Sequence, residues 1–397
     1  MPAVDPSKKA LTRVTCARFV PPILRRELEE LGYEVQHEDH TAVDIGATLH
    51  ECLDLLLTLR TAHHVMWMLK RFRCPSPKAL YTEVAAFPWE ELIPSDGYVT
   101  VTSNVEHPKI DNSMYPNLVV KDAIVDRMTK AAGRRPDSGP DRTGVVVHLF
   151  WKGDRAWLYL NVNGEMLSQR GYRKIPHDAP MRETLGAAVV LATGYTGDQP
   201  FVNPMCGSGT LAIEAALIAT NRAPGLLRSD YAFRQTLLDL EDAWQDARAR
   251  ARKQTIKSEP APIVATDHDP RAIEASVRNA TTAGVEHLID FSVCDFSRTR
   301  VPEPAEGEEP GGVVLLNPEY GLRLGEHEEL EETYTAIGDF FKQECGGYTG
   351  HVFTGSKSLA KRVGLKTASR TPFMNAQIEC RLLSYELYAG TRKQSDS

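Results

Sequence analysis

The 397-residue chain lacks the cysteine patterns of a zinc ribbon or a disulfide-stapled domain. Its seven cysteines are widely spaced, none forms a C-x-x-C pair, and an odd, sparse count does not suit a disulfide framework. The chain also lacks an uncharged apolar run of the ~18 residues that a membrane helix needs, and its first residues lead into no apolar signal segment. We therefore expect a cytoplasmic protein that makes no membrane contact.

Positive charge is in the minority. The chain has 46 Lys and Arg against 53 Asp and Glu, a net charge of −7, which argues against a surface that binds nucleic acid everywhere. Residues 1–180, however, contain 23 basic and 23 acidic residues, so the acidic excess lies entirely in the remainder. Basic residues of this neutral part cluster within residues 61–80 and 109–174. A solvated surface is the simpler interpretation of any single one, but the clusters suit contacts to RNA phosphates. The candidates for such contacts are Lys70, Arg71, Arg73, Lys121, Arg134, Arg135 and Arg173.

The succession of elements changes near residue 180. Before it, short strand-like runs mix with amphipathic helices, which predicts an α+β region. After it, strands and helices alternate strictly, which predicts a parallel sheet with helices on both faces. In this second part we expect residues 237–253 to form a long charged helix. Residues 376–388 are expected to form two strands at the antiparallel edge of the sheet.

A glycine-rich turn follows the first strand of the second part. The segment FVNPMCGSGTLAI, residues 201–213, predicts a buried strand, a turn with Gly207 and Gly209, and an apolar helix capped by Thr210. Glycines at such a turn let a ligand approach the backbone, and the free N–H groups of the helix start favour an anionic or polar ligand. The turn is weak evidence by itself, and it departs from the G-x-G-x-x-G pattern of NAD-binding folds.

Acidic residues follow the next two predicted strands. Asp267 ends the second strand, where an acid can accept both hydroxyls of a ribose, and Asp269 is expected to cap the helix that Pro270 opens. Asp295 ends the third strand and could accept from an adenine amino group, while Phe296 could flank the ring. A solvated loop acid is an equally good interpretation of Asp295 alone.

The fourth strand ends in the sequence N-P-E-Y-G. Asn317 offers a carbonyl acceptor, Pro318 blocks helix formation and turns its own carbonyl outward, and Tyr320 offers a stacking face. These groups together suit a flipped base with an exocyclic amine, although N-P-x-Y by itself is more often a simple turn.

These strand ends, in this order, resemble one family. N-P-M-C-G-S-G-T, T-D-x-D-P, C-D-F and N-P-x-Y-G resemble the motifs of class I S-adenosylmethionine methyltransferases that modify amino nitrogens. R-G-Y-R at 170–173, A-P-M-R-E-T-L at 179–185, A-P-G-L at 223–226 and I-E-C at 378–380 sharpen the match. They resemble the bacterial large-subunit rRNA guanine-N2 methyltransferases that carry a THUMP domain, over about residues 10–390.

The resemblance implies two domains. Residues 1–165 would form a ferredoxin-like and THUMP region that binds RNA. Residues 166–397 would form a Rossmann-like class I methyltransferase domain with a mostly parallel seven-stranded sheet. The implied activity is methyl transfer from S-adenosylmethionine to the N2 amine of a guanine in 23S rRNA or its assembly precursors, without a metal and without an obligate protein partner.

The resemblance also implies site residues. Asn317 and the Pro318 carbonyl would accept from the guanine amine, and Tyr320 would stack on the base. Asp267 would hold the ribose of the cofactor, and Asp295 with Phe296 its adenine. The methionine moiety would lie along Met205, Cys206, Gly207, Ser208, Gly209 and Thr210, with Asn203 nearby.

Two positions depart from the family pattern. Asn203 stands where the family usually has Asp, which removes a carboxylate near the charged methionine end of the cofactor and is expected to lower affinity. Glu319 stands where the family usually has a second Pro. Two further hypotheses therefore stay open. One is a catalytically impaired RNA-binding or ribosome-assembly factor that keeps the fold, and the other is an adenine-N6 RNA methyltransferase.

Overall fold

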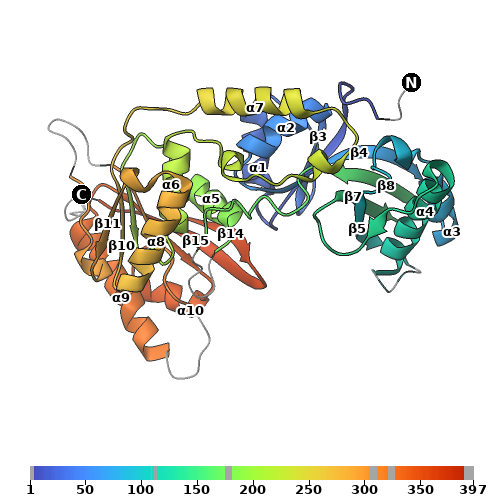
Figure 1. Cartoon of the computed structure of the whole chain (residues 1–397). Helices are drawn as coiled ribbons and strands as arrows, with labels where there is room; N and C mark the ends of the chain where they lie inside the picture. Colours follow the sequence, from blue (N-terminus) through green and yellow to red (C-terminus); the bar gives the residue numbers. More distant parts are fainter. Residues whose placement is uncertain are drawn as a thin grey trace. The chain divides into compact units, whose positions relative to one another are not determined.

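The computed structural model describes residues 4–108, 110, 112, 114–174, 181–303, 311–320 and 327–388. The chain divides into two compact units (Figure 1). Unit 1 comprises residues 1–16, 24–169 and 228–253, and unit 2 comprises residues 17–23, 170–227 and 254–397. Ala179, Pro180 and Gly321, which belong to the motifs above, lie outside the described residues. Across the described part of the chain, no helix is long and apolar enough to span a membrane.

The first part of unit 1 has the β-α-β-β-α-β order of a ferredoxin-like fold. Its strands lie in the order β2-β3-β1-β4, and all neighbours are antiparallel. Thr48 starts the second helix with a reciprocal capping box, because its side chain accepts from the Glu51 N–H and Glu51 accepts from the Thr48 N–H. The elements are β1 (Ala10–Cys16), α1 (Pro21–Glu30), β2 (Val35–Glu38), β3 (Ala42–Ala47), α2 (Leu49–Thr58) and β4 (Ala62–Arg73). The predicted ferredoxin-like start is confirmed.

The same sheet continues through the rest of unit 1 to eight strands, in the order β2-β3-β1-β4-β8-β7-β5-β6. The added elements are α3 (Pro77–Ala85), η1 (Trp89–Glu91), β5 (Tyr98–Glu106), α4 (Met114–Ala132), β6 (Asp137–Ser138), β7 (Val145–Lys152), β8 (Arg155–Asn161), η3 (Ala232–Gln235) and α7 (Glu241–Lys253). Strands β7 and β8 are neighbours in the chain and pair antiparallel. The THUMP assignment of this region stays a prediction.

Helix α7 comes from a late part of the sequence but packs within unit 1. It lies against α2, buries Trp244 and pairs Arg250 with Asp54 through guanidinium–carboxylate contacts of 2.9 Å. The long charged helix expected from residue 237 begins instead at Glu241. Residues 170–227 and 254–397, on either side of the segment that contains α7, belong to unit 2, so local pattern placed the helix in the wrong part of the fold. The boundary near residue 165 otherwise stays a prediction.

Unit 2 is built on one seven-stranded sheet in the order β11-β10-β9-β12-β13-β15-β14. The strands from β11 to β13 are parallel, and β15 runs antiparallel to both of its neighbours. The strands are β9 (Phe201–Pro204), β10 (Ile263–Asp267), β11 (Ile289–Val293), β12 (Val313–Leu316), β13 (Thr349–Thr354), β14 (Ser369–Asn375) and β15 (Ile378–Glu386). This arrangement confirms the predicted class I methyltransferase architecture.

Helices cover the sheet of unit 2. They are α5 (Glu183–Ala192), α6 (Thr210–Ala219), α8 (Pro270–Ala283), α9 (His327–Glu344) and α10 (Lys357–Ala360), with short turns η2 (Pro224–Leu227), η4 (Glu286–Leu288), η5 (Phe296–Arg298) and η6 (Lys361–Val363). Every residue of β9 and β12 is buried, as expected for strands covered on both faces. On one face, Val202 and Val314 join Ile337 and Phe341 of α9 in a hydrophobic core cluster. Helix α6 is buried along almost its whole length, which fits a helix that is apolar all round.

The expectation of two strands in residues 376–388 is wrong. This segment contributes one strand, β15, whose hairpin partner β14 precedes it. Strand β14 contains Pro372, although proline cannot donate to a ladder. Proline is tolerated here because β14 is the last strand of the sheet and pairs with β15 alone.

Candidate active site

The candidate site lies where the strand order of unit 2 reverses. β9 is flanked by β10 on one side and by β12 on the other, so the chain leaves β9 in opposite directions along the sheet. In open α/β sheets, ligands bind outside the carboxyl ends of the strands at such a switch point. Since β9, β10 and β12 are parallel neighbours, their carboxyl ends bring the glycine turn, Asp267 and the N-P-E-Y segment to the same edge.

The glycine turn has an unusual backbone. Met205, Gly207 and Gly209 all have positive φ angles, of 56°, 56° and 81°, and Met205 adopts this conformation although it is not a glycine. A Cβ on Gly209 would lie 3.0 Å from Ser276, so the approach of α8 requires glycine there, whereas a Cβ on Gly207 would point into open space. The turn is thus tight on one side and open to a ligand on the other.

The predicted cap of the following helix is wrong by one residue. Gly209 is the N-cap and offers no side-chain cap, because it has no side chain and its backbone is left-handed. Thr210 is the first helical residue, and its hydroxyl accepts from Arg173 at 3.0 Å. The N–H groups that begin α6 therefore keep no side-chain cap of the usual kind.

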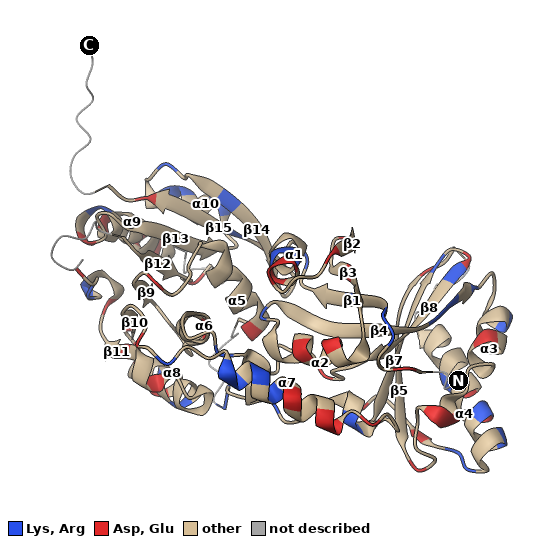
Figure 2. Ribbon diagram, turned by 90° about the horizontal axis from the view of Figure 1, so that it is seen from above, with Lys and Arg blue, Asp and Glu red and all other residues tan. Residues whose placement is uncertain are grey.

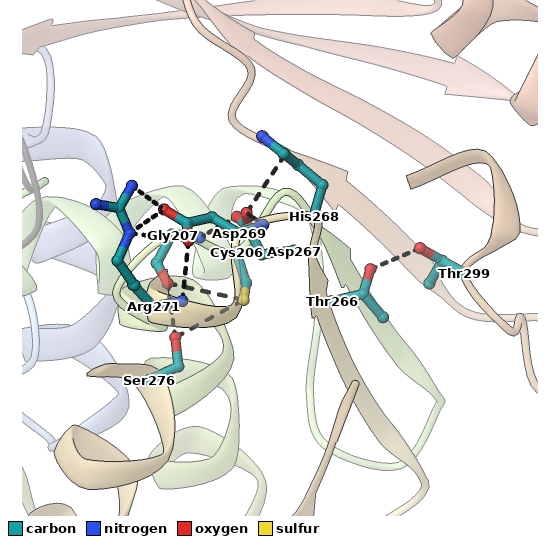
Figure 3. A network of polar contacts seen from close by, with 9 residues as sticks. All are labelled: Cys206, Gly207, Thr266, Asp267, His268, Asp269, Arg271, Ser276 and Thr299. Atoms are coloured by element: carbon teal, nitrogen blue, oxygen red, sulfur yellow. Dashed lines mark hydrogen bonds and ion pairs between the residues drawn. The ribbon is translucent and has the colours of Figure 1, made fainter. Parts of the chain in front are cut away.

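Side chains of β10 and α8 hold the glycine turn in place (Figure 3). The Gly207 N–H donates to Oδ2 of Asp267 at 3.0 Å, and the Ser276 hydroxyl donates to the Gly207 carbonyl at 2.7 Å. Asn279 donates to the Ser208 carbonyl at 3.1 Å. Cys206 is buried, with Sγ 3.7 Å from the Ser276 hydroxyl, and burial raises its pKa to about 12. This cysteine is consequently a protonated packing residue of the turn.

Arg173 is a second anchor of the same turn. Its guanidinium donates to the Ser208 hydroxyl at 3.1 Å, to Thr210 Oγ1, to the Met181 carbonyl at 2.7 Å and to Glu183 at 3.2 Å. Its side chain is only 13% exposed. The structure therefore places Arg173 at the turn, and its expected contact with RNA stays an untested prediction.

A fully buried ion pair joins Arg170 to Glu214 of α6. Arg170 donates to Glu214 at 2.6 Å, and the Tyr172 hydroxyl donates to the other carboxylate oxygen of Glu214 at 2.9 Å. All three side chains are at most 2% exposed. The R-G-Y-R motif thus supplies Arg170 and Tyr172 to the helix and Arg173 to the turn that precedes it.

The acidic residues expected at the ligand are all engaged by the protein's own N–H groups. Asp269 caps α8 as predicted, with its carboxylate accepting from the Arg271 N–H at 2.9 Å. Asp267 is 8% exposed and accepts from the N–H groups of Gly207 and Asp269, one at each oxygen. Each carboxylate oxygen has a second lone pair, so Asp267 keeps the capacity to accept a ribose hydroxyl.

The two residues expected at the adenine lie at the start of η5. Asp295 caps this turn and accepts from the Ser297 N–H at 2.9 Å, and the hydrogen bond from the Ser297 hydroxyl lowers its pKa. Its side chain is exposed. Phe296 is half-buried and packs edge-on against Phe340, with ring centroids 6.2 Å apart. Their adenine contacts stay predictions.

Two asparagines at the switch point carry unpartnered oxygens. Asn203 is fully buried, and its Nδ2 donates to the Leu315 carbonyl of β12 at 2.7 Å. Oδ1 of Asn203 and Oδ1 of the half-buried Asn317 are both buried without a hydrogen-bond partner among the described residues. Buried acceptors are rarely left unpaired in a folded protein, so each of these two oxygens calls for a partner such as an ordered water, an ion or a ligand. Both oxygens can accept from an amino group.

Side chains of α9 and β14 contact the rest of the N-P-E-Y segment. Pro318 is buried, and the Tyr334 hydroxyl of α9 donates to the Glu319 carbonyl at 3.3 Å. The Glu319 side chain, which replaces the second proline of the family pattern, is exposed. Tyr320 is half-buried, and its hydroxyl oxygen lies 2.9 Å from Nδ2 of Asn375.

The basic residues proposed for RNA all lie in unit 1 except Arg173, and acidic partners neutralise several of them. Lys70 pairs with Glu83 at 2.8 Å, Arg73 with Asp154 at 3.3 Å, and Lys121 contacts its neighbour Asp122 at 3.0 Å. Figure 2 shows basic residues (blue) and acidic residues (red) interspersed along the helices of this unit. Arg71 lies over the ring of Trp157 on β8, while Arg134 and Arg135 are exposed after α4. They lie on separate elements, β4 and the region of α4, and their joint role stays a prediction.

Sequence reasoning missed the α8 residues that hold the turn. Ser276 and Asn279 are small polar residues on the buried face of α8, where Ala272 and Ala283 are also buried. A polar residue at a buried helical position is the signal that could have identified them. No group of three or more His, Cys, Asp or Glu that could hold a metal occurs within the described ranges.

Family models match both parts of the chain. Residues 170–384 match the model described as "RMKL-like, methyltransferase domain", and residues 13–66 match the "RlmL ferredoxin-like domain". Curated relatives named "Ribosomal RNA large subunit methyltransferase K/L" include those of Syntrophotalea carbinolica, at 34% identity over 94% of this chain, and Pseudomonas aeruginosa, at 32% over 94%. The matches cover 53% and 52% of those relatives, so the chain spans about half of their length.

Solved structures share the fold of the whole chain. A "predicted N6-adenine-specific DNA methylase" from Listeria monocytogenes is 29% identical with a TM-score of 0.85, covering 96% of this chain and 97% of its own. A "possible methylase" from Clostridium difficile is 25% identical with a TM-score of 0.85, covering 97% and 100%. The family model covers more than half of this chain, from residue 170 through the glycine turn and into the strand β15 of unit 2. The chain belongs to the RMKL-like methyltransferase family.

Proposed function

We propose that this protein transfers a methyl group from S-adenosylmethionine to the exocyclic N2 amine of a guanine in 23S rRNA. The observation that carries the proposal is the buried Oδ1 of Asn317 beside the glycine turn at the switch point, which has no hydrogen-bond partner among the described residues. An acceptor in that position suits the hydrogens of an amino group that must lie close to the cofactor. The names of the relatives, which refer to the large ribosomal subunit RNA, support the substrate.

The residues at the turn fit the cofactor. Backbone at Met205 through Thr210 would hold the methionine moiety, where the open side of Gly207 leaves space. The unpartnered oxygen of Asn203 suits the α-ammonium group, and Asp267 the ribose hydroxyls. Asp295 and Phe296 would border the adenine. When bound, S-adenosylmethionine supplies an electrophilic methyl group on a sulfonium.

The protein's contribution to the reaction is mainly positioning. Asn317 Oδ1 and the Pro318 carbonyl accept the two hydrogens of the amine and so fix the direction of its nitrogen toward the methyl group. Tyr320 presents its ring to the base. Holding the two reacting groups in line replaces a bimolecular encounter, which supplies a large share of the rate enhancement without a metal.

The RNA would be held by unit 1. Basic residues on β4 and after α4 suit phosphate contacts, which position an RNA without reading its sequence. The partner is then 23S rRNA or one of its assembly precursors, and a cytoplasmic location follows from that substrate.

A methyl-transfer assay on undermodified 23S rRNA tests the proposal. Tritiated S-adenosylmethionine is incubated with the RNA and the wild-type protein, the Asn317→Ala variant or the Glu319→Pro variant. Labelled nucleosides are then identified after digestion. N2-methylguanosine formed by the wild type and lost in Asn317→Ala, with cofactor binding retained in calorimetry, supports the proposal.

The same assay separates two other functions. The name of the Listeria structure favours an adenine-N6 activity as second candidate, and labelled N6-methyladenosine would establish it. If only Glu319→Pro is active, the natural protein is an RNA-binding or ribosome-assembly factor that has lost catalysis. RNA binding without any cofactor binding would lead to the same conclusion.

A further inference from the structure

The tip of the β14–β15 hairpin contacts the N-P-E-Y segment. Nδ2 of Asn375, the last residue of β14, donates to the Tyr320 hydroxyl oxygen at 2.9 Å. Cys380 Sγ on β15 lies 3.5 Å from the same oxygen. Tyr320 is 55 residues from Asn375 and 60 from Cys380, so the tertiary fold alone brings these groups together. The I-E-C motif, which the proposed chemistry leaves without a role, supplies Cys380.

The Tyr320 ring is also fixed along its edge. A Cβ added to Gly355, which follows β13, would lie 2.9 Å and 3.0 Å from two ring carbons of Tyr320 and 2.8 Å from Cγ2 of Ile378. Gly355 therefore makes room for the ring, and Ile378 of the hairpin borders the same space. Tyr320 thus has one edge against Gly355 and its hydroxyl against the hairpin.

The hairpin tip is short and well paired. Asn375 pairs with Ile378 across the two-residue connection Ala376–Gln377, and Phe373 pairs with Cys380 two steps further. Phe373 and Cys380 are fully buried, so the base of the tip is anchored in the core of unit 2. A donor on such a tip has little freedom to move relative to the sheet.

We propose that Asn375 is a positioning residue that fixes the Tyr320 ring through its hydroxyl oxygen. The hairpin thereby sets the orientation of the aromatic face that the N-P-E-Y segment offers to the target base. This inference rests on the proposed function for its consequence in catalysis. The contact itself does not depend on which base is methylated.

A double-mutant cycle tests whether Asn375 acts through Tyr320. Asn375→Ala removes the donor, Tyr320→Phe removes the acceptor but keeps the ring, and the third variant combines the two changes. We expect each single variant to lower kcat of methyl transfer about tenfold, because a small misplacement of a reacting group is costly. The cofactor Kd should stay within about twofold in all three. The double variant should be no slower than either single one, because the two changes remove the same contact.

Gln377→Ala is the matched control. Gln377 is exposed on the same tip, and its variant should keep the wild-type kcat and KM. Losses that multiply in the double variant would overturn the inference, as would a wild-type kcat in Asn375→Ala. A rise in KM with kcat unchanged would also overturn it, because it would indicate a binding role for Asn375.

A spectroscopic measurement decides the inference even if the protein methylates no RNA. 3-Fluorotyrosine placed at position 320 alone reports the ring by fluorine NMR. Asn375→Ala should shift or broaden this resonance, and Gln377→Ala should leave it unchanged. An unaltered resonance in Asn375→Ala would refute the positioning role. Absence of methyl transfer by the wild type would instead refute the proposed function.

Discussion

Replacing Asn203 by aspartate should destabilise unit 2, and more strongly at neutral pH than at acidic pH. Asn203 is fully buried, and its Nδ2 donates to the Leu315 carbonyl, joining β9 to β12 at 2.7 Å. Aspartate has nearly the same shape but no N–H. An ionised carboxylate would leave the Leu315 carbonyl unpaired and would place a charge in the core beside it.

The magnitude of the destabilisation follows from the least costly state of the new side chain, which is a protonated aspartic acid that donates to the Leu315 carbonyl. Holding the proton at pH 7.5 against an ordinary pKa of about 3.9 costs at most about 5 kcal/mol, and at pH 5 about 1.5 kcal/mol. The folded-state pKa of the new acid is raised, so stability is lost as pH rises from about 4 toward that pKa. We expect a loss of about 3–5 kcal/mol at pH 7.5 and of 1–2 kcal/mol at pH 5.

Urea unfolding at several pH values measures this difference. All five tryptophans, at positions 67, 89, 151, 157 and 244, lie in unit 1, so their fluorescence serves as an internal reference, while far-UV circular dichroism also follows unit 2. Gln377→Glu, which adds a negative charge on an exposed residue, is the control. An Asn203→Asp protein as stable as the wild type at pH 7.5, or a difference that does not change with pH, would refute the reasoning. The expected weakening of cofactor binding by Asn203 itself stays a separate prediction.

Three further changes have defined outcomes. Arg173→Lys keeps the charge but loses the forked contacts to the glycine turn, so calorimetry with S-adenosylmethionine should show an affinity about tenfold lower, and an unchanged Kd would contradict this role. Burial lowers the pKa of His148 to about 4. The stability of unit 1 should therefore fall as pH drops from about 6.5 toward 4, by up to about 1.4 kcal/mol per pH unit. Tryptophan fluorescence should show a shallower dependence in His148→Gln, and equal slopes would exclude His148 as the cause. Ala376 has a φ of 52°, so Ala376→Gly should stabilise the hairpin by about 0.5–1 kcal/mol, and a lower urea midpoint would count against this strain.

Local chemistry explains what could be predicted along the chain. Asp269 was identifiable as a helix cap because its partner lies two residues away and Pro270 opens the helix beside it. The parallel sheet of unit 2 could be predicted from the alternation of strands and helices, since a parallel sheet needs a crossover connection between successive strands. The hairpin partner β14 was missed because Pro372 excludes a central strand but not an edge strand, and only the sheet order distinguishes the two.

The α/β class of unit 2, the glycine turn and the candidate acceptor Asn317 can all be read from the sequence, because each depends on residues adjacent in the chain. The tertiary structure decided that α7 belongs to unit 1, that Arg173 holds the turn, and that Asn203 joins two strands. It also decided that a hairpin residue reaches Tyr320. The contacts of Arg173 with Ser208, of Asn375 with Tyr320 and of Asn203 with Leu315 join residues that are 35, 55 and 112 positions apart, and the Arg250–Asp54 pair of α7 joins residues that are 196 apart. Their partners are selected by packing of whole elements, and periodicity along the chain carries no information about which distant side chain fills a given position.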